Sequence, residues 1–185
     1  MVFFLIAIIA WVTIPSYAEP ITAEQSLAYI IEGNQRYLQE LNDPDLSLAR
    51  REALATKQHP FAVIVGCSDS RVPPEHIFDQ GLGDLFVIRL AGNVVDTLAV
   101  GSVEYAIAEL GVPLVVVLGH EGCGAIKASV HSHLHDAGVD GGIAAIVGLI
   151  QPSVASVLET STATGTELYE RVTDANIMSV MNLPH

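Results

Sequence analysis

Hydrophobic positions in the middle of the chain form runs of two kinds. Three short runs, residues 61–65, 85–90 and 114–118, are almost entirely apolar, rich in Val, Ile and Phe, and without polar alternation. Such runs are typical of parallel strands buried on both faces. Between the second and third runs, residues 97–110 carry apolar side chains at helical spacing, and Gly111 follows. The pattern predicts a right-handed βαβ unit and an α/β fold with a parallel-core β-sheet.

Helical spacing also occurs on both sides of this unit. Residues 23–41 begin after Thr22, which forms the capping-box pattern Thr-x-x-Gln with Gln25. Further helices are predicted over residues 48–56, 123–131, 142–158 and 166–181. A chain of 185 residues with 50% apolar composition has room for one sizeable core. We therefore expect a single domain over residues 19–185, with helices flanking the sheet.

The first eighteen residues differ from the rest in having no charged side chain. Their apolar run, residues 2–14, is too short to span a bilayer as a helix but fits the core of a secretory signal, and Ala18 ends a short segment suited to cleavage. We predict a signal peptide over residues 1–18 and an exported protein, periplasmic or secreted. No Lys or Arg precedes the run, so an uncleaved N-terminal membrane anchor or a different start codon stays an alternative.

The net charge of −13 resides entirely on the remainder of the chain. Nucleic acids and anionic membranes attract basic surfaces, so this acidity argues against both as partners.

The only two cysteines lie in segments that follow predicted strands. Cys67 begins the segment CSDSR after the first strand, and Cys123 belongs to HEGCG, which starts with His120 after the third strand. Because ligands bind outside the carboxyl ends of parallel strands, these three residues are expected to converge. A disulfide would be the ordinary use of two cysteines in an exported protein. Two thiolates and one imidazole, however, suit Zn²⁺ and leave a fourth tetrahedral position for water, so we favour one catalytic zinc ion per chain.

Two charged residues accompany the first cysteine. Asp69 and Arg71 alternate on one short segment and can form a charge-assisted pair. One interpretation is a surface salt bridge of little energetic value. The alternative, which we favour, is that Asp69 accepts the proton of zinc-bound hydroxide while Arg71 keeps it ionised and off the metal.

These segments, CSDSRVPPE and GHEGCGA, resemble the two signature segments of the β-class carbonic anhydrases, and the resemblance extends from about residue 23 to residue 180. It is also carried by GNQRY at residues 33–37, by FDQGLGDLFVIRLAGNV and by SVEYAIAELG. The resemblance implies zinc-dependent reversible hydration of carbon dioxide to bicarbonate, with Cys67, His120 and Cys123 as zinc ligands and with Asp69 and Arg71 as the catalytic dyad.

The same resemblance implies a substrate pocket and a partner subunit. Gln58 matches a glutamine that contacts substrate across a dimer interface, and Phe86, Tyr105 and Gly124 match positions that line the pocket. We therefore expect a homodimer or a higher homo-oligomer, with the first helix on a partner subunit. Family members usually continue into another strand beyond the point where this sequence ends, so we expect a sheet without that C-terminal edge strand.

Other functions stay open on the sequence alone. One is a noncatalytic zinc-binding or assembly protein on the same fold, and another is a related hydrolase such as a carbon disulfide hydrolase. The alternating His131, His133 and His135 either bind a second metal or relay protons, or they are the solvated end of a helix.

Overall fold

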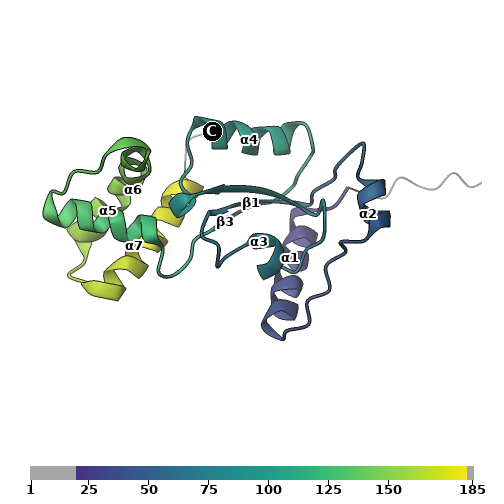
Figure 1. Ribbon diagram of the computed structural model, residues 1–185, viewed down its shortest axis with the longest axis horizontal. Coiled ribbons are helices and arrows are strands. Elements are labelled where there is room, and N and C mark those ends of the chain that lie inside the picture. The colour runs from purple at the N-terminus through teal and green to yellow at the C-terminus, as the bar shows by residue number, and fades with distance from the viewer. Residues whose placement is uncertain (1–19, 183–185) are drawn as a thin grey trace, which may run out of the picture.

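A three-stranded parallel sheet lies at the centre of the computed structural model, which describes residues 20–182 (Figure 1). Its strands are β1 (Ala62–Cys67), β2 (Leu85–Leu90) and β3 (Val115–Leu118), in the order β2-β1-β3. Cys67 pairs with Leu90, and Gly66 pairs with Leu118, so the carboxyl ends of all three strands meet at one edge. The predicted α/β fold is confirmed. The predicted signal peptide lies outside the described residues.

Helices cover both faces of the sheet and its carboxyl edge. They are α1 (Ala23–Leu38), α2 (Leu48–Ala53), α3 (Pro74–Ile77), the 3-10 helix η1 (Ala91–Asn93), α4 (Thr97–Ala108), α5 (Gly124–His135), α6 (Gly141–Thr160) and α7 (Gly165–Met181). In Figure 1, α4 lies on one side of the sheet and α1 and α3 lie on the other.

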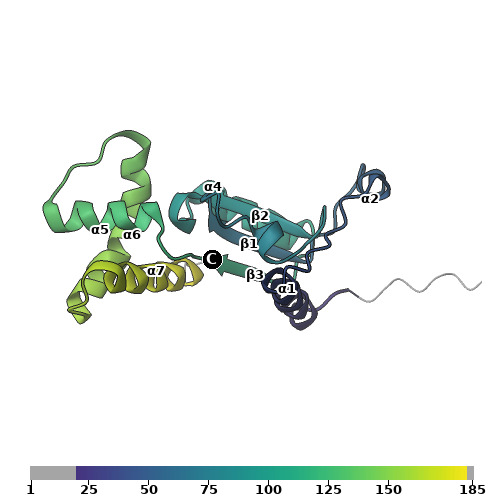
Figure 2. The same cartoon turned by 60° about the horizontal axis from the view of Figure 1, so that its bottom comes forward.

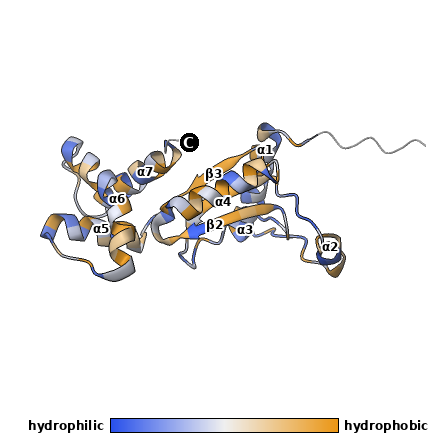
Figure 3. Cartoon of the chain, turned by 90° about the horizontal axis from the view of Figure 1, so that it is seen from above, coloured by the Kyte–Doolittle hydropathy of each residue, from blue (hydrophilic) through white to orange (hydrophobic). Residues whose placement is uncertain are grey.

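The alternation of β1 side chains explains this layering. Ile64 packs with Ile30 of α1 and with Phe78, which follows α3, whereas Val63 and Val65 point the other way and pack toward α4. Every residue of β1 is buried, as the run of apolar residues without alternation predicts. Figure 3 shows the strands mostly in hydrophobic colours.

The last three helices form a second packed layer beyond the carboxyl ends of the strands (Figure 2). Helix α6 is long and apolar enough to cross a membrane by length and composition alone, but it packs against both α5 and α7. Its Ile150 and Val154 are fully buried in one hydrophobic cluster with Cys67 and Cys123. The two cysteines therefore sit where the sheet meets this helical layer.

Several element boundaries differ from those predicted. Helix α1 begins as predicted, since Thr22 and Gln25 form the reciprocal capping-box hydrogen bonds, but it ends at Leu38, three residues early. Strand β1 continues past the predicted residue 65 because Gly66 and Cys67 also pair with β2. Helix α5 likewise extends past residue 131 to His135. The short α3 and η1 were not predicted.

A buried carboxylate holds α1 against the loop that follows α3. The Asp79 side chain, 1% exposed, forms an ion pair with Arg36 and accepts hydrogen bonds from the Asp43 amide (2.9 Å) and from Asn42 (3.3 Å). Burial alone would raise the pKa of Asp79, but the hydrogen bonds from these three residues together lower it. The cluster fixes the end of α1 against the loop that follows α3.

Candidate metal centre

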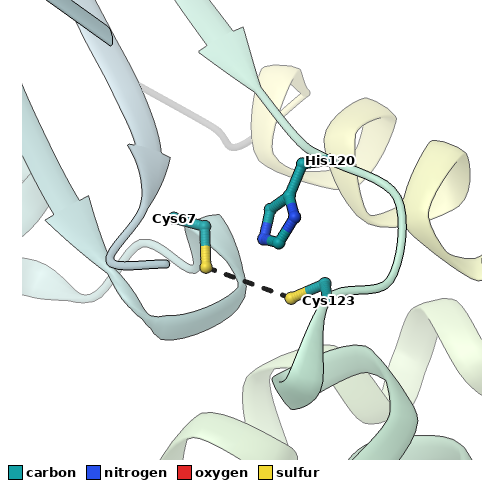
Figure 4. Close-up of side chains that lie close together, drawn as sticks. All are labelled: Cys67, His120 and Cys123. Carbon is teal, nitrogen blue, oxygen red and sulfur yellow. Dashed lines mark hydrogen bonds between the residues drawn. The ribbon is translucent and has the colours of Figure 1, made fainter. Parts of the chain in front are cut away.

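The carboxyl edge of the sheet brings the three predicted ligands together. Cys67 is the last residue of β1, His120 follows β3 by two residues, and Cys123 directly precedes α5. Figure 4 shows the imidazole of His120 directed toward the two sulfur atoms. All three side chains are buried or nearly so.

The spacing of the donor atoms matches a tetrahedral zinc site. The two Sγ atoms are 4.0 Å apart, and the ligand atoms of the three residues all lie within 4.8 Å of one another. With Zn–S bonds of about 2.3 Å, a tetrahedron places two sulfurs about 3.8 Å apart. Both cysteines are free, and 4.0 Å is far from the roughly 2.05 Å of a disulfide bond. The disulfide alternative is therefore wrong for this structure.

The His120 ring is oriented for binding a cation. Its Nδ1 lies 3.0 Å from the carbonyl oxygen of Glu121, and because a carbonyl only accepts, Nδ1 carries the proton. Nε2 then holds a lone pair, and it is buried with no hydrogen-bond partner among residues 20–182. A buried acceptor without a partner is costly, and a metal ion at the centre of the three residues would satisfy it.

Backbone amides donate to or face both sulfurs, while burial opposes the anionic form of Cys123. Cys67 Sγ accepts hydrogen bonds from the amides of Gly92 (3.1 Å) and Asp69 (3.4 Å). Burial raises the pKa of the Cys123 thiol, against the opposing effect of the amides of Ile126 and Ala125 at the start of α5. A divalent cation deprotonates a coordinating thiol outright. The donor set thus fits Zn²⁺, the cofactor predicted from the sequence.

Asp69 and Arg71 form a bidentate pair beside the three ligands. The guanidinium donates from Nε to Oδ1 (2.9 Å) and from Nη2 to Oδ2 (2.7 Å), and the Arg71 amide donates to Oδ1 (3.0 Å). These hydrogen bonds hold the pKa of Asp69 well below its usual range. Its Oδ2 is 3.8 Å from His120 Nε2, so an ionised carboxylate borders the space between the ligands. Arg71 also reaches the Gly122 carbonyl (3.3 Å), which joins the two ligand-bearing segments.

One residue that sequence reasoning did not single out holds the Cys67 segment in place. Arg89, next to the end of β2, donates from Nε to the Cys67 carbonyl (2.8 Å) and from Nη2 to the Asp69 carbonyl (2.6 Å). Its guanidinium therefore fixes the backbone on either side of Ser68. No motif indicated this role, because it depends on the pairing of β1 with β2.

A second group of residues missed by sequence reasoning supports Cys67 from η1. Gly92 has a φ of 76°, and a Cβ there would lie 2.8 Å from Ile150 and 2.9 Å from Ala125, so only glycine fits. Its carbonyl accepts a hydrogen bond from the buried Asn176 of α7 (2.9 Å). The amide that contacts the Cys67 sulfur is therefore held in place by the last helix.

The predicted pocket residues fall into two places. Gly124 immediately follows Cys123, and a Cβ there would meet open space. Phe86 and Tyr105 have ring centroids 6.4 Å apart, and Tyr105 and Gln58 line one hollow of about 480 Å³. Phe86 pairs with Val63, four residues before the Cys67 level, which is about 13 Å along the strand. A single chain therefore does not bring these three residues to its own ligand cluster.

Comparisons with known proteins agree with this geometry. A sequence model of the family described as carbonic anhydrase matches residues 62–183. The chain is 47% identical to carbonic anhydrase 2 of Mycobacterium tuberculosis over 137 residues, which cover 73% of this chain and 64% of that protein. It is 46% identical to a carbonic anhydrase of Mycolicibacterium smegmatis over 140 residues, 74% and 66% of the two chains. The chain thus spans less than two thirds of the length of these relatives.

Solved structures give the same result for the fold. A tetrameric β-carbonic anhydrase of Sordaria macrospora superposes with a TM-score of 0.66 and 26% identity, covering 86% of this chain and 82% of that one. The β-carbonic anhydrase CafA of Aspergillus fumigatus gives a TM-score of 0.64 and 28% identity, covering 85% and 73%. The strand-end cluster, the sequence relatives and the superpositions all agree: this chain belongs to the carbonic anhydrase family, with the fold of its β class.

Proposed function

We propose that the protein catalyses the reversible hydration of carbon dioxide to bicarbonate and a proton, with one Zn²⁺ held by Cys67, His120 and Cys123. The observation that carries this proposal is the buried Nε2 of His120, which faces two free thiols and has an ionised carboxylate beside it. Bound there, Zn²⁺ would supply the Lewis acidity that makes water a nucleophile near neutral pH.

The chain's own residues would position that nucleophile. Asp69 uses both oxygens on Arg71, and its Oδ2 also borders the ligand cluster, so it can accept one hydrogen bond there. Because its pKa is held low, the carboxylate acts as a fixed acceptor and stays ionised. Arg71 prevents the carboxylate from turning toward the cation, and Arg89 holds the intervening backbone.

A second copy of the chain would complete the substrate pocket. Gln58 and Tyr105 line a hollow that opens near the amino ends of the strands, far from the ligands of the same chain. Helix α1 exposes large apolar side chains, including Leu27, Tyr29 and Ile31, each close to half exposed. Such a surface favours association, and we propose a homodimer as the smallest active unit.

The activity is tested by measuring ¹⁸O exchange between carbon dioxide and water together with the zinc content of the same sample. We expect about one zinc per chain and exchange that is abolished when the zinc is removed and restored when it returns. One zinc per chain without exchange would contradict the proposal and favour a noncatalytic zinc-binding protein. Turnover of carbon disulfide in place of carbon dioxide would favour the related hydrolase.

The shared pocket is tested by mixing two impaired variants. Gln58→Ala leaves the zinc ligands intact, and His120→Ala removes a ligand but keeps Gln58. If Gln58 acts across the interface, a mixed dimer contains one complete site, so unfolding and refolding the two variants together should restore part of the exchange rate. Mixed dimers, verified by mass spectrometry, that show no recovery would contradict the shared pocket.

We also propose that the protein is exported, supported by the uncharged apolar residues 1–18. Cell fractionation with N-terminal sequencing of the recovered chain tests this. A chain that begins near residue 19 in the periplasm or medium is the expected result. A chain with its first eighteen residues in the membrane fraction would show an uncleaved anchor, and one in the cytoplasm would contradict export.

A further inference from the structure

Three exposed histidines near the end of α5 separate into a pair and a single residue. His133 turns toward α6, where its Nδ1 lies 2.9 Å from Gln151 Oε1. The rings of His131 and His135 instead lie side by side, with centroids 4.5 Å apart and planes at 48°. The alternating sequence HSHLH does not show this division, because the helix places residues four apart on one face and turns the middle histidine away.

The paired rings are placed as two ligands of one cation. Imidazole nitrogens bind Zn²⁺, Cu²⁺ and Ni²⁺, with bonds of about 2.0–2.1 Å to zinc, which places two adjacent ligand nitrogens about 3 Å apart. Rings with centroids 4.5 Å apart come within this range by small rotations of their side chains. Both residues are exposed, so the remaining coordination positions are open to water.

The electrostatic surroundings favour a cation at this place. His135 is the last residue of α5, where the carbonyl ends of the helix carry a partial negative charge. Asp136 caps the helix in the left-handed conformation and adds a carboxylate next to the pair. The whole chain carries a net charge of −13, which raises the local concentration of cations.

We propose that His131 and His135 form a surface site for a divalent transition-metal ion of the zinc, copper and nickel class. The site is distinct from the Cys-His-Cys centre, since α5 begins at Gly124 and its rise of about 1.5 Å per residue places His131 about 10 Å further along. It offers two nitrogen ligands and no thiolate, so it binds exchangeable ions more weakly than the buried centre. This proposal does not depend on the catalytic one.

The test uses the untagged full chain loaded with zinc, and immobilised Ni²⁺–nitrilotriacetate as the probe. This chelate leaves two adjacent coordination positions, which the pair would fill, and it cannot enter the buried centre. We expect His131→Ala and His135→Ala each to weaken binding at least about tenfold, because each leaves a single imidazole. His133→Ala is the matched control: it removes an exposed histidine of the same stretch and should leave binding unchanged.

Circular dichroism and one zinc per chain in every variant establish that the fold and the buried centre are intact. Equal weakening by all three substitutions would overturn the proposal, since binding would then depend only on the number of histidines. Unchanged binding in His131→Ala or in His135→Ala would overturn it as well.

Discussion

The two ends of the same small sheet are built in contrasting ways. At the carboxyl end, Cys67 is held by the amide of Gly92, by the Arg89 guanidinium on its carbonyl and, through Gly92, by Asn176 of α7. At the amino end, Gln58 and Tyr105 line an open hollow, and Tyr105 is half exposed. One end is closed by contacts within the chain, and the other presents an open surface.

This difference corresponds to two tasks of the proposed enzyme, which are to hold the metal ligands and to form the substrate pocket. Metal ligands must be held within fractions of an ångström, and that precision comes from buried hydrogen bonds to the backbone. A substrate pocket tolerates looser placement, and in the proposed homodimer a second subunit would complete it. Substitutions of the zinc ligands and of the residues that hold them at the carboxyl end should therefore affect zinc binding, and those at the amino end should leave the zinc in place and affect the shared pocket, stability or assembly.

The largest effect is expected from Cys67→Ser. A hydroxyl is a far poorer zinc ligand than a thiolate, so both zinc and exchange activity should be lost. Metal analysis by mass spectrometry and the ¹⁸O assay measure this, and His120→Ala and Cys123→Ser should behave alike. Ser70→Ala, an exposed neighbour in the same loop, should keep its zinc. Full zinc occupancy in Cys67→Ser would refute the proposed ligand set.

Arg71→Ala should separate chemistry from metal binding at this end. Without the guanidinium, the Asp69 carboxylate is free to turn toward the cation, so exchange should fall by about 100-fold or more while zinc is retained. The assay is run beside a metal determination. Undiminished exchange in Arg71→Ala would show that the Asp69–Arg71 pair has no role in catalysis. A crystal structure of the unsubstituted protein near pH 8 with an Asp69 oxygen bonded to zinc would refute the claim that the pair keeps the fourth zinc position open to water.

Arg89→Gln tests whether the backbone clamp matters for the metal. Loosening the carbonyls of Cys67 and Asp69 should weaken zinc binding by about 10–100-fold, the range for residues that orient metal ligands. Competition with a chelator measures it. Arg50→Gln is the matched control at the amino end, because Arg50 also donates to a backbone carbonyl, that of Leu82 (2.8 Å), and to a carboxylate. Equal losses in both variants would point to general destabilisation.

The smallest effect is expected away from the zinc ligands, from Asp79→Asn in the cluster that holds α1. The variant should lose about 1–3 kcal/mol of unfolding free energy at pH 7, because the Arg36 partner remains without its carboxylate. A carboxylate with a lowered pKa stabilises the fold above its unfolded pKa of about 3.9, and this contribution disappears as the pH falls through the folded pKa. The difference between the two proteins should therefore shrink below about pH 4, as measured by urea unfolding. A difference independent of pH would contradict the ion-pair account.

The fold was predictable where burial on both faces leaves a continuous apolar run. β2 begins and ends at the predicted residues 85 and 90, whereas the end of β1 was predicted two residues early, because Gly66 is a weak strand former and Cys67 was assigned to the loop. The end of α5 was missed because residues 132–135 are polar apart from Leu134 and show no apolar period. Predictions of element boundaries therefore fail where strand pairing or solvent exposure decides where an element ends.

The candidate site was predictable from the chemistry of its donors and the meeting of parallel strand ends. Arg89 and Asn176 were not, since both act on backbone carbonyls, and no sequence pattern reports which carbonyl a distant side chain reaches. The pairing of His131 with His135 could be recognised only once the helix was known, because in the sequence the three histidines alternate and none is distinguished from the others.

The hydrogen bond that orients the His120 ring has a consequence for sequence drift. Its acceptor is the main-chain oxygen of Glu121, which is present whichever residue occupies that position, and the Glu121 side chain is exposed. The identity of the side chain at position 121 therefore does not affect which nitrogen of the His120 ring carries the proton. A saturation library should then accept most residues at position 121 directly beside a position 120 that accepts almost none, an abrupt boundary between adjacent residues.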